Sequence, residues 1–348
     1  MIRFLKNRLV IFVIVAAGAA VFTLAMVKAT GILSWAPTCW GPGGLPVGGL
    51  WNSGTAMPEA RLEPAFAVLD GRVYIVGGMK AGWLASSVTQ IYDPLGDRWQ
   101  TGAPVPVDIH HATMSALGGY LYLVGGYDDM GKMLRAEPDI SQGWRYDPTG
   151  DTWTPIADMP APRAAHAMVE INGLLYVVGG TGENARSVWV YDPATDSWDT
   201  SRRGLMPTMR EHLAAVALDG QIYVFGGRWK DVNIGTVEKY DPASDTWTTL
   251  ADMPTPRSTM SLAVLNGRIH VVGGEDMVRA CTHVAHEVYD PASDTWTALA
   301  PMPTSRQGMA SVVIDGRWYL ISGSVGSARF ADRGLTGLVE IFFPGEGV

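Results

Sequence analysis

Three ionisable side chains stand at equivalent positions of a repeated segment. Glu63, His111 and His212 each lie two residues after a position at which Arg recurs along the chain. A carboxylate and two imidazoles can act as general acid and base, and the same groups can bind a metal ion. The corresponding positions of the other repeats carry Ala165, Thr259 and Gly308. The residue types therefore allow acid–base chemistry if the fold brings Glu63, His111 and His212 together.

The other histidines are weaker candidates. His270 replaces the Tyr of a strand and His166 occupies a mostly apolar position, so both are expected in the core. His283, His286 and Glu287 could offer metal ligands, but histidines three residues apart on a strand point to opposite faces. No Gly-rich segment leads into a helix, so phosphate binding at a helix N-terminus is not expected. We therefore predict no metal site and no cofactor.

Six repeats, spaced by 47–54 residues, must position these side chains. Each has a short β-branched and aromatic segment that follows a tight-turn pair such as Asp70-Gly71, which is typical of antiparallel strands. The segments end at Gly77-Gly78, Gly125-Gly126, Gly179-Gly180, Gly226-Gly227, Gly273-Gly274 and Ser322-Gly323. A Tyr and, seven residues later, a Trp follow in five repeats: Tyr92 and Trp99, Tyr146 and Trp153, Tyr191 and Trp198, Tyr240 and Trp247, Tyr289 and Trp296.

In these anchors, which recur from about residue 50 to residue 348, the chain resembles the kelch-repeat family. The resemblance implies an all-β, six-bladed β-propeller with four antiparallel strands per blade. It also implies that the residues two positions after the recurrent Arg line the mouth of a central channel, where Glu63, His111 and His212 would form one polar ring. The Arg itself occurs in five of the six repeats and is expected to be structural.

The sixth repeat lacks an outer strand. Phe342 stands where the other repeats have Tyr, and the Trp position seven residues later would be residue 349. The segment from Trp51 to Pro58 has the same Trp-to-Pro spacing as the outer strands of the other repeats. We therefore predict that the N-terminal strand completes the last blade and removes an exposed sheet edge.

One connection of the repeat varies in length. The number of residues between Gly-Gly and the Tyr, or Phe342, is 13, 19, 10, 12, 14 and 18, whereas the preceding spans are constant. In an up-and-down blade this connection emerges on the same face as the crossover between blades. Loops on a rigid framework often carry binding residues, so this is the predicted ligand-binding face. Its candidate residues are Glu63, Lys80, Trp83, His111, Asp128, Glu183, His212, Arg228, Trp229 and Glu275.

The N-terminal region is organised differently. Residues 9–27 form an uncharged run that would span roughly 28 Å as a helix, so residues 1–28 are predicted to be a transmembrane anchor or, alternatively, a cleaved signal sequence. Basic residues before the run favour a cytoplasmic N-terminus and an extracytoplasmic propeller; signal cleavage would leave the propeller secreted or periplasmic. Residues 29–49 are a Gly/Pro-rich linker. Cys39 and Cys281 either pair or remain free thiols.

A net charge of −8, with no basic cluster beyond the N-terminus, argues against nucleic acid as a partner. The sequence most directly predicts a non-catalytic recognition domain that binds a protein, peptide or glycan on the variable face. The alternative is a carbohydrate-active enzyme, because six-bladed kelch propellers similar to this chain include a periplasmic sialic acid mutarotase. Ring opening of an aldose requires an acid and a base, which Glu63, His111, His212, Glu275 or Arg228 would supply.

Overall fold

The computed structural model describes residues 38–39, 50–128, 140–182, 185–199, 201 and 203–345. The chain divides into two units, residues 1–33 and 34–348, and every described residue belongs to the second. The predicted membrane segment, residues 9–27, lies outside the described residues, as does the predicted linker apart from Thr38 and Cys39. Within the part of the chain that is described, no helix is long and apolar enough to cross a membrane.

Four antiparallel strands make up each main sheet, as predicted. Sheet 1 contains β3 (Ala65–Leu69), β4 (Arg72–Val76), β7 (Thr89–Asp93) and β8 (Arg98–Gly102). Sheet 2 contains β9 (Thr113–Leu117), β10 (Tyr120–Val124), β11 (Gly143–Asp147) and β12 (Thr152–Ile156). Sheet 3 contains β13 (Ala167–Ile171), β14 (Leu174–Val178), β15 (Trp189–Asp192) and β16 (Ser197–Asp199).

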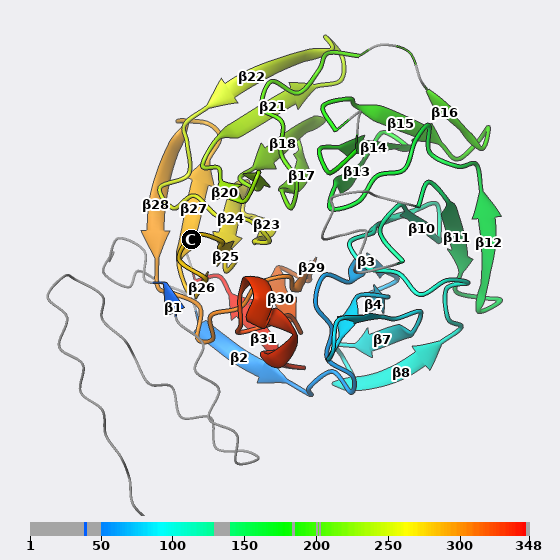
Figure 1. Cartoon of the computed structure of the whole chain (residues 1–348), viewed down its shortest axis with the longest axis horizontal. Coiled ribbons are helices and arrows are strands. Elements are labelled where there is room, and N and C mark those ends of the chain that lie inside the picture. Colours follow the sequence, from blue (N-terminus) through cyan, green and yellow to red (C-terminus); the bar gives the residue numbers. More distant parts are fainter. Residues whose placement is uncertain are drawn as a thin grey trace, which may run out of the picture. The chain divides into compact units, whose positions relative to one another are not determined.

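The second half of the chain repeats this order. Sheet 4 contains β17 (Ala214–Leu218), β18 (Gln221–Phe225), β21 (Val237–Asp241) and β22 (Thr246–Leu250). Sheet 5 contains β23 (Ser261–Leu265), β24 (Arg268–Val272), β27 (His286–Asp290) and β28 (Thr295–Leu299). Sheet 6 contains β29 (Ala310–Ile314), β30 (Arg317–Ile321), β31 (Val339–Phe343) and β2 (Leu50–Gly54). The described residues thus form six four-stranded sheets, which surround a common axis with the first strand of each repeat innermost (Figure 1).

The N-terminal strand closes sheet 6, as predicted. β2 pairs antiparallel with β31, and Trp51 lies opposite Phe342. The same register places Tyr opposite Trp in the other five sheets, for example Tyr289 opposite Trp296. The first two strands of each sheet meet at a two-residue turn in which both residues have positive φ, as at Asp70 (49°) and Gly71 (70°). Such turns match the twist of antiparallel strands, which explains the recurring Asp-Gly and Asn-Gly pairs.

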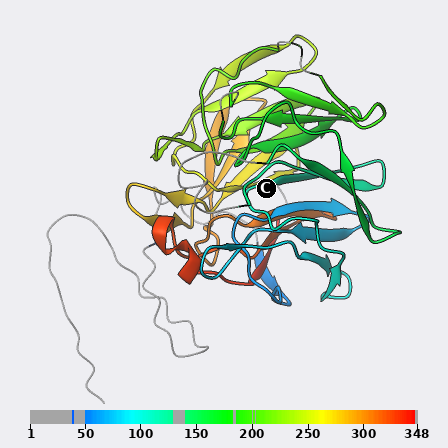
Figure 2. The ribbon, with the colours of Figure 1, turned by 45° about the vertical axis from the view of Figure 1, so that its right-hand side comes forward.

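Smaller elements occupy the variable connections. They are the hairpins β5 (Met79–Lys80) with β6 (Leu84–Ala85), β19 (Arg228–Trp229) with β20 (Val232–Asn233), and β25 (Glu275–Asp276) with β26 (Cys281–His283), together with the 3₁₀ helix η1 (Ala328–Arg333). The short strand β1 (Thr38–Cys39) pairs parallel with β26. Figure 2 shows η1 (red) and the β25–β26 hairpin (gold) projecting on the same side of the sheets.

The recurrent Arg side chains are buried and structural, as predicted. Three of them pair with a carboxylate on the third strand of their own sheet; Arg257 Nη2, for example, donates to Glu287 at 2.7 Å. Arg163 instead lies 3.6 Å above the ring of Trp189 and donates to the Ser187 carbonyl. A buried guanidinium needs such partners because desolvation of an unpaired charge is costly. These Arg side chains are therefore committed to the sheets and not to a ligand.

Candidate functional site

A closed ring of backbone hydrogen bonds surrounds the axis. It is formed by the six residues two positions after the recurrent Arg, which we call the axial ring: Glu63, His111, Ala165, His212, Thr259 and Gly308. The N–H of each donates to the carbonyl of the ring residue in the preceding repeat, and Glu63 completes the circle by donating to Gly308, over N···O distances of 2.9–3.1 Å. The ring thus aligns one residue from every repeat at the same level.

All six residues of the axial ring have left-handed backbone conformations, with φ between 50° and 60°. Glycine adopts this conformation readily, whereas a non-Gly residue in it is uncommon and costs of order 1 kcal/mol. Five of the six residues are not glycine, and Thr259 is β-branched. The circle of hydrogen bonds is made in this conformation, and it fixes the backbone that carries Glu63, His111 and His212.

These three side chains are brought together, as the acid–base hypothesis requires. Their potential ligand atoms all lie within 4.8 Å of one another, and the rings of His111 and His212 are 4.8 Å apart at their centroids. They line a cavity of about 220 Å³ whose wall includes residues from the innermost strand of every sheet. Glu63 Oε1 and His212 Nδ1 are buried and have no hydrogen-bond partner among the described residues. Buried polar atoms without partners are rare in folded proteins, which marks this cluster as a candidate site.

Arg228 connects the cluster to two further carboxylates. Its Nε donates to Glu211 Oε1 at 3.0 Å and its Nη1 to Glu275 Oε1 at 2.7 Å. Its Nη2 lies 3.1 Å from His212 Nε2, and because a guanidinium only donates, this nitrogen must accept. The other ring nitrogen of His212, Nδ1, lies 3.6 Å from Glu211 Oε1.

The surroundings shift the proton affinities of the site in opposite directions. Burial raises the pKa of Glu63, against the opposing effects of His212 and Arg228. Burial, assisted by the neighbouring His110, lowers the pKa of His111 well below its usual value. Burial also acts on Glu211, but His212 and Arg228 outweigh it and bring the pKa of Glu211 to about 2. The site thus combines a His111 imidazole that binds a proton more weakly than usual with a Glu63 carboxyl that holds its proton more tightly than usual.

The cluster fits proton transfer better than metal binding. Two imidazoles and a carboxylate are a suitable ligand set for a divalent cation. However, Arg228 already donates a hydrogen bond to His212 Nε2, so its positive charge would lie next to a cation bound there and would repel it. A carboxyl with a raised pKa beside an imidazole with a lowered pKa can instead donate and accept a proton at one substrate.

The remaining predicted site residues are divided between this network and the surface. Arg228 and Glu275 belong to the buried network, whereas Lys80 and Trp83 are partly exposed in the first hairpin. Trp229 and Asp128 are exposed. Glu183 lies outside the described residues.

Sequence reasoning missed two members of the cluster. Glu211 binds Arg228, and His110 Nδ1 lies 2.6 Å from His111 Nδ1. Both immediately precede a residue of the axial ring, so the position one after the recurrent Arg was an available signal.

The variable connections carry most of the exposed large hydrophobic side chains on the described residues. Nine large hydrophobic side chains are exposed among the described residues, and six of them lie in these connections: Leu84, Trp229, Val232, Val278, Phe330 and Leu338. The other three are Leu50, Leu95 and Leu205. Apolar side chains gathered on one face of a soluble domain usually mark an interaction surface.

The sequence left His283, His286 and the two cysteines unassigned to a site. His286 Nε2 lies 2.9 Å from His270 Nδ1, while Glu287 binds Arg257 and Thr255, so these three potential ligands diverge as expected for a strand. His283 lies instead beside the cysteines. Cys39 and Cys281 form a disulfide, which decides between the two states left open by the sequence.

Comparisons with known proteins agree with this architecture. The family model described as KLHDC2/KLHL20/DRC7 Kelch-repeats domain matches residues 110–323, which is more than half of the chain, and the Kelch motif matches residues 60–106. The solved structure titled "Structure of YjhT" superposes with a TM-score of 0.68 at 15% identity, over 82% of this chain and 96% of that one. At this identity the likeness concerns the fold alone.

Curated relatives match over shorter stretches. Human Kelch-like protein 30 is 42% identical over 57 residues, which is 16% of this chain and 10% of that protein. Mouse Kelch-like protein 35 is 32% identical over 153 residues, which is 43% of this chain and 25% of that protein. The chain therefore spans a quarter or less of the length of these two relatives. The repeats, the sheet topology and the matching family model together show that this chain belongs to the kelch-repeat family.

Proposed function

We propose that this chain is a six-bladed kelch propeller that recognises a protein or peptide with the face carrying its variable connections. Kelch-repeat domains generally bind other proteins. The observation that carries the proposal is the concentration of exposed apolar side chains on this face, six of the nine on the described residues. Polar side chains such as Lys80 and Asp128 stand in the same connections, and protein interfaces combine apolar and polar side chains in this way.

The central part of this face is suited to specificity. Arg228 and Glu275 form an ion pair with side chains that are 11% and 4% exposed. Trp229 follows Arg228 on β19 and is 37% exposed, and it shares its hairpin with Val232, which is 60% exposed. Aromatic and apolar anchors beside a fixed charged network commonly account for most of the binding energy at an interface.

Substitution of one apolar residue on each face provides the test. Peptides are selected from a phage-displayed random library on the full chain, and their affinity is measured by calorimetry against Val232→Asp and Leu95→Asp. Leu95 is 94% exposed and lies between β7 and β8, a connection that emerges on the opposite face. We expect Val232→Asp to weaken binding at least about tenfold, because it places a charge in an apolar contact, and Leu95→Asp to have no effect. Equal binding by both variants, or no selected peptide, would contradict the proposal.

The disulfide supports an extracytoplasmic location for the propeller, since disulfides persist mainly in oxidising compartments. We propose that residues 9–27 anchor the chain with a cytoplasmic N-terminus, with secretion after signal cleavage as the alternative. Protease added to intact cells would degrade an anchored propeller while leaving cytoplasmic markers whole. Full protection of the propeller, both in intact cells and in cells stripped of any envelope outside the cytoplasmic membrane, would contradict this location.

A carbohydrate-active enzyme is the second candidate, and the axial-ring cluster favours it. Glu63, with a raised pKa, lies next to the imidazoles of His111 and His212, and these groups are the acid and base that sugar ring opening requires. The test follows anomeric exchange of N-acetylneuraminic acid by NMR for the wild type, Glu63→Gln and His212→Gln. Catalysis that is lost in both variants would support the enzyme, and exchange at the uncatalysed rate in the wild type would exclude this substrate.

A further inference from the structure

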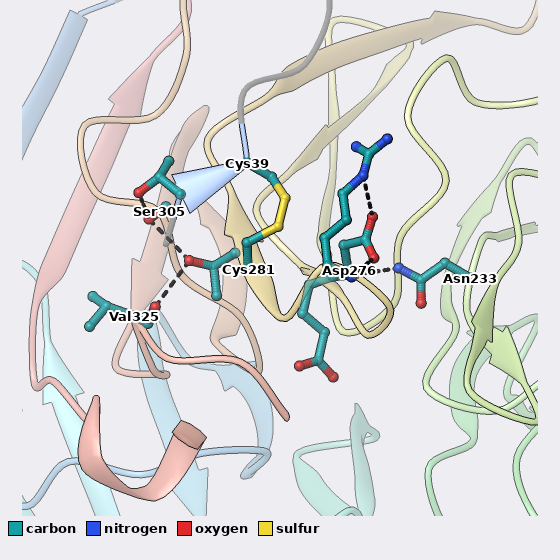
Figure 3. Close-up of a disulfide and its surroundings, with 10 residues drawn as sticks. Cys39, Asn233, Asp276, Cys281, Ser305 and Val325 are labelled. Carbon is teal, nitrogen blue, oxygen red and sulfur yellow. Dashed lines mark hydrogen bonds and ion pairs between the residues drawn. A yellow bond between two sulfur atoms is a disulfide. The ribbon is translucent and has the colours of Figure 1, made fainter. Parts of the chain in front are cut away.

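We propose that Cys39, Cys281, His283 and Asp276 form a binding site for a zinc ion when the disulfide is reduced. Figure 3 shows Cys39 and Cys281 joined between β1 and the β25–β26 hairpin, with Asp276 on the neighbouring strand. Cys39 Sγ, a carboxylate oxygen of Asp276 and a ring nitrogen of His283 lie within 4.8 Å of one another. The sulfur of Cys281 is bonded to that of Cys39, which places a fourth potential ligand beside these three.

His283 supplies an independent indication of a ligand. Its residue is 2% exposed, and neither Nδ1 nor Nε2 has a hydrogen-bond partner among the described residues. Its backbone is held in place, because its N–H donates to the Gly274 carbonyl at 2.9 Å. Leaving both nitrogens of a buried imidazole unbonded costs free energy, and coordination to a metal ion would satisfy one of them.

The ligands stay together without the disulfide bond. β1 pairs with β26, where Thr38 lies opposite Thr282 and Cys39 opposite His283. The hydroxyls of Thr38 and Thr282 both lie within 3.1 Å of the hydroxyl of Ser305, so the short strand is attached through its side chains as well. Reduction therefore leaves two thiols beside His283 and Asp276 in place of two sulfurs bonded to each other.

Zinc is the ion that these four groups fit best. Structural zinc sites use four ligands from Cys, His and Asp in a tetrahedral arrangement, with metal–ligand distances of about 2.0–2.3 Å. Thiolates select against magnesium and calcium, which require oxygen ligands. Asp276 pairs with Arg279, whose Nε lies 3.7 Å from the carboxylate and whose side chain is 73% exposed, so this cation can leave when an ion binds.

The chemistry balances with a trialkylphosphine as reductant. The S–S bond breaks, phosphorus takes the oxygen of one water molecule to become the phosphine oxide, and both sulfurs become thiols. Zinc then forms two metal–thiolate bonds and releases two protons. An oxidant of the disulfide class reverses the switch by taking two electrons from the thiolates and releasing zinc.

The experiment titrates the full chain, purified in detergent, with Co²⁺, which replaces zinc and reports thiolate coordination by a sulfur-to-metal charge-transfer band. Phosphine-reduced and oxidised protein are compared without oxygen. We expect one Co²⁺ per reduced chain, the charge-transfer band, displacement by an equivalent of zinc, and no such band in the oxidised chain.

Three ligand variants and one control variant test the site residue by residue. Cys39→Ser should abolish the band, and Asp276→Asn should weaken binding at least about tenfold, as should His283→Ala. Arg279→Ala is the matched control. It should strengthen Co²⁺ binding, because it removes the side chain that pairs with the Asp276 carboxylate. Near-UV circular dichroism identifies any variant that fails to fold, and Asp276→Asn, at a less buried position, then provides the decisive comparison.

Three outcomes would overturn the proposal. The reduced chain binds no Co²⁺, or it binds Co²⁺ without the charge-transfer band, or Cys39→Ser binds as tightly as the wild type. Binding that depends on the cysteines but is unaffected by Asp276→Asn and His283→Ala would also overturn the four-ligand site. The partner recognition proposed above is independent of these results.

Discussion

Five of the boundaries between neighbouring sheets share one set of side-chain bonds, and the boundary between sheets 5 and 6 lacks it. At the boundary between sheets 4 and 5, Trp296 Nε1 donates to the Ala251 carbonyl at 3.0 Å, and the Ala251 N–H donates to Asp294 Oδ1 at 2.8 Å. Tyr289 donates its hydroxyl to the same Asp294 oxygen at 2.7 Å. We call this Tyr–Asp–Trp set a latch. It recurs with Trp99, Trp153, Trp198 and Trp247.

The boundary between sheets 5 and 6 is built from rings instead. Trp51 stands at the latch position, but its Nε1 has no partner among the described residues. Its ring packs on Phe342 at 5.1 Å and on His286 at 6.2 Å, and His286 in turn contacts His270 and Trp318. The sheet-6 repeat has no Asp five residues after Phe342, which explains the missing latch.

The segment preceding the propeller compensates at this boundary. Cys39 is bonded to Cys281 of the fifth repeat, while Thr38 lies 3.1 Å from Ser305 of the sixth. Strand β1 therefore joins the two repeats whose sheets share no latch. Five boundaries are thus held by latches between adjacent repeats, one of which involves the segment after β2. The last boundary depends instead on contacts between residues far apart in the sequence.

Removal of β2 is expected to have the largest effect. Deleting residues 50–54 exposes β31 and removes five pairs of facing residues together with the Trp51 ring. Taking about one interstrand hydrogen bond for each facing pair and about 1 kcal/mol for each bond, we expect the free energy of unfolding to fall by about 5 kcal/mol. The Tm should then fall by about 10 °C or more in a circular dichroism melt. Deleting residues 1–33, which belong to the separate unit, is the control and should leave the Tm unchanged. An unchanged Tm after deletion of 50–54 would show that β2 does not stabilise sheet 6.

Loss of the disulfide is expected to come next. The bond joins residues separated by 242 positions, so it restrains a large part of the unfolded chain. We expect Cys39→Ser to lower the free energy of unfolding by about 2–4 kcal/mol in urea titrations. In a reducing buffer without metal the variant and the wild type should be equally stable. A difference that persists after reduction would point to the Ser side chain itself.

The two kinds of boundary should lose stability at different pH values. Burial, assisted by Arg268, lowers the pKa of His270 from 6.5 to about 4, so the folded state disfavours its protonation. Stability is therefore full above the unfolded value near 6.5 and is lost as the pH falls from there towards 4. His270→Tyr restores the residue type of the other repeats, and we expect it to remove about 1–3 kcal/mol of this pH dependence. Parallel curves for wild type and variant between pH 7 and 4 would contradict the assignment.

The latch aspartates should respond at lower pH. The backbone N–H of Ala251 and the hydroxyl of Tyr289 hold the pKa of Asp294 below its usual value. The resulting stability is present above the unfolded Asp value, near 4, and disappears as the pH falls further. The boundary of sheets 5 and 6 is thus expected to weaken in mild acid, before the latches do.

The smallest expected change in stability is the difference between two tryptophan substitutions. Trp296→Phe removes the hydrogen bond to Ala251, whereas Trp51→Phe removes none, although both rings pack at similar distances, 5.2 Å from Tyr289 and 5.1 Å from Phe342. We expect Trp296→Phe to be more destabilising than Trp51→Phe by about 1 kcal/mol in urea titrations. Equal losses would mean that the latch hydrogen bond contributes nothing to stability.

Much of the fold could be predicted from the sequence. The Gly-Gly and turn pairs locate the first two strands, and the seven-residue Tyr-to-Trp spacing sets the register of the last two, as Tyr289 and Trp296 show. The same spacing identified Trp51 as the missing partner of Phe342. Asp294 and its equivalents also stand at a constant offset, five residues after each Tyr, and this signal for the latch was overlooked.

The candidate site was only partly predictable. The register of Glu63, His111 and His212 was visible, but their left-handed backbone and the circle of hydrogen bonds were not. Five of those bonds join residues about fifty positions apart and the sixth joins Glu63 to Gly308, near the two ends of the repeats, and no local pattern encodes such pairings.

The sequence by itself determined the repeat, the strands, the closure by β2 and the face that varies, because these follow from the two-residue period of a strand and from turn chemistry. Only the tertiary structure decided that Cys39 forms a disulfide with Cys281 and that His283, and not His286, lies beside them. It also decided that Arg228 donates a hydrogen bond to His212. These contacts depend on distances between separate repeats, which are set when the sheets pack around the axis.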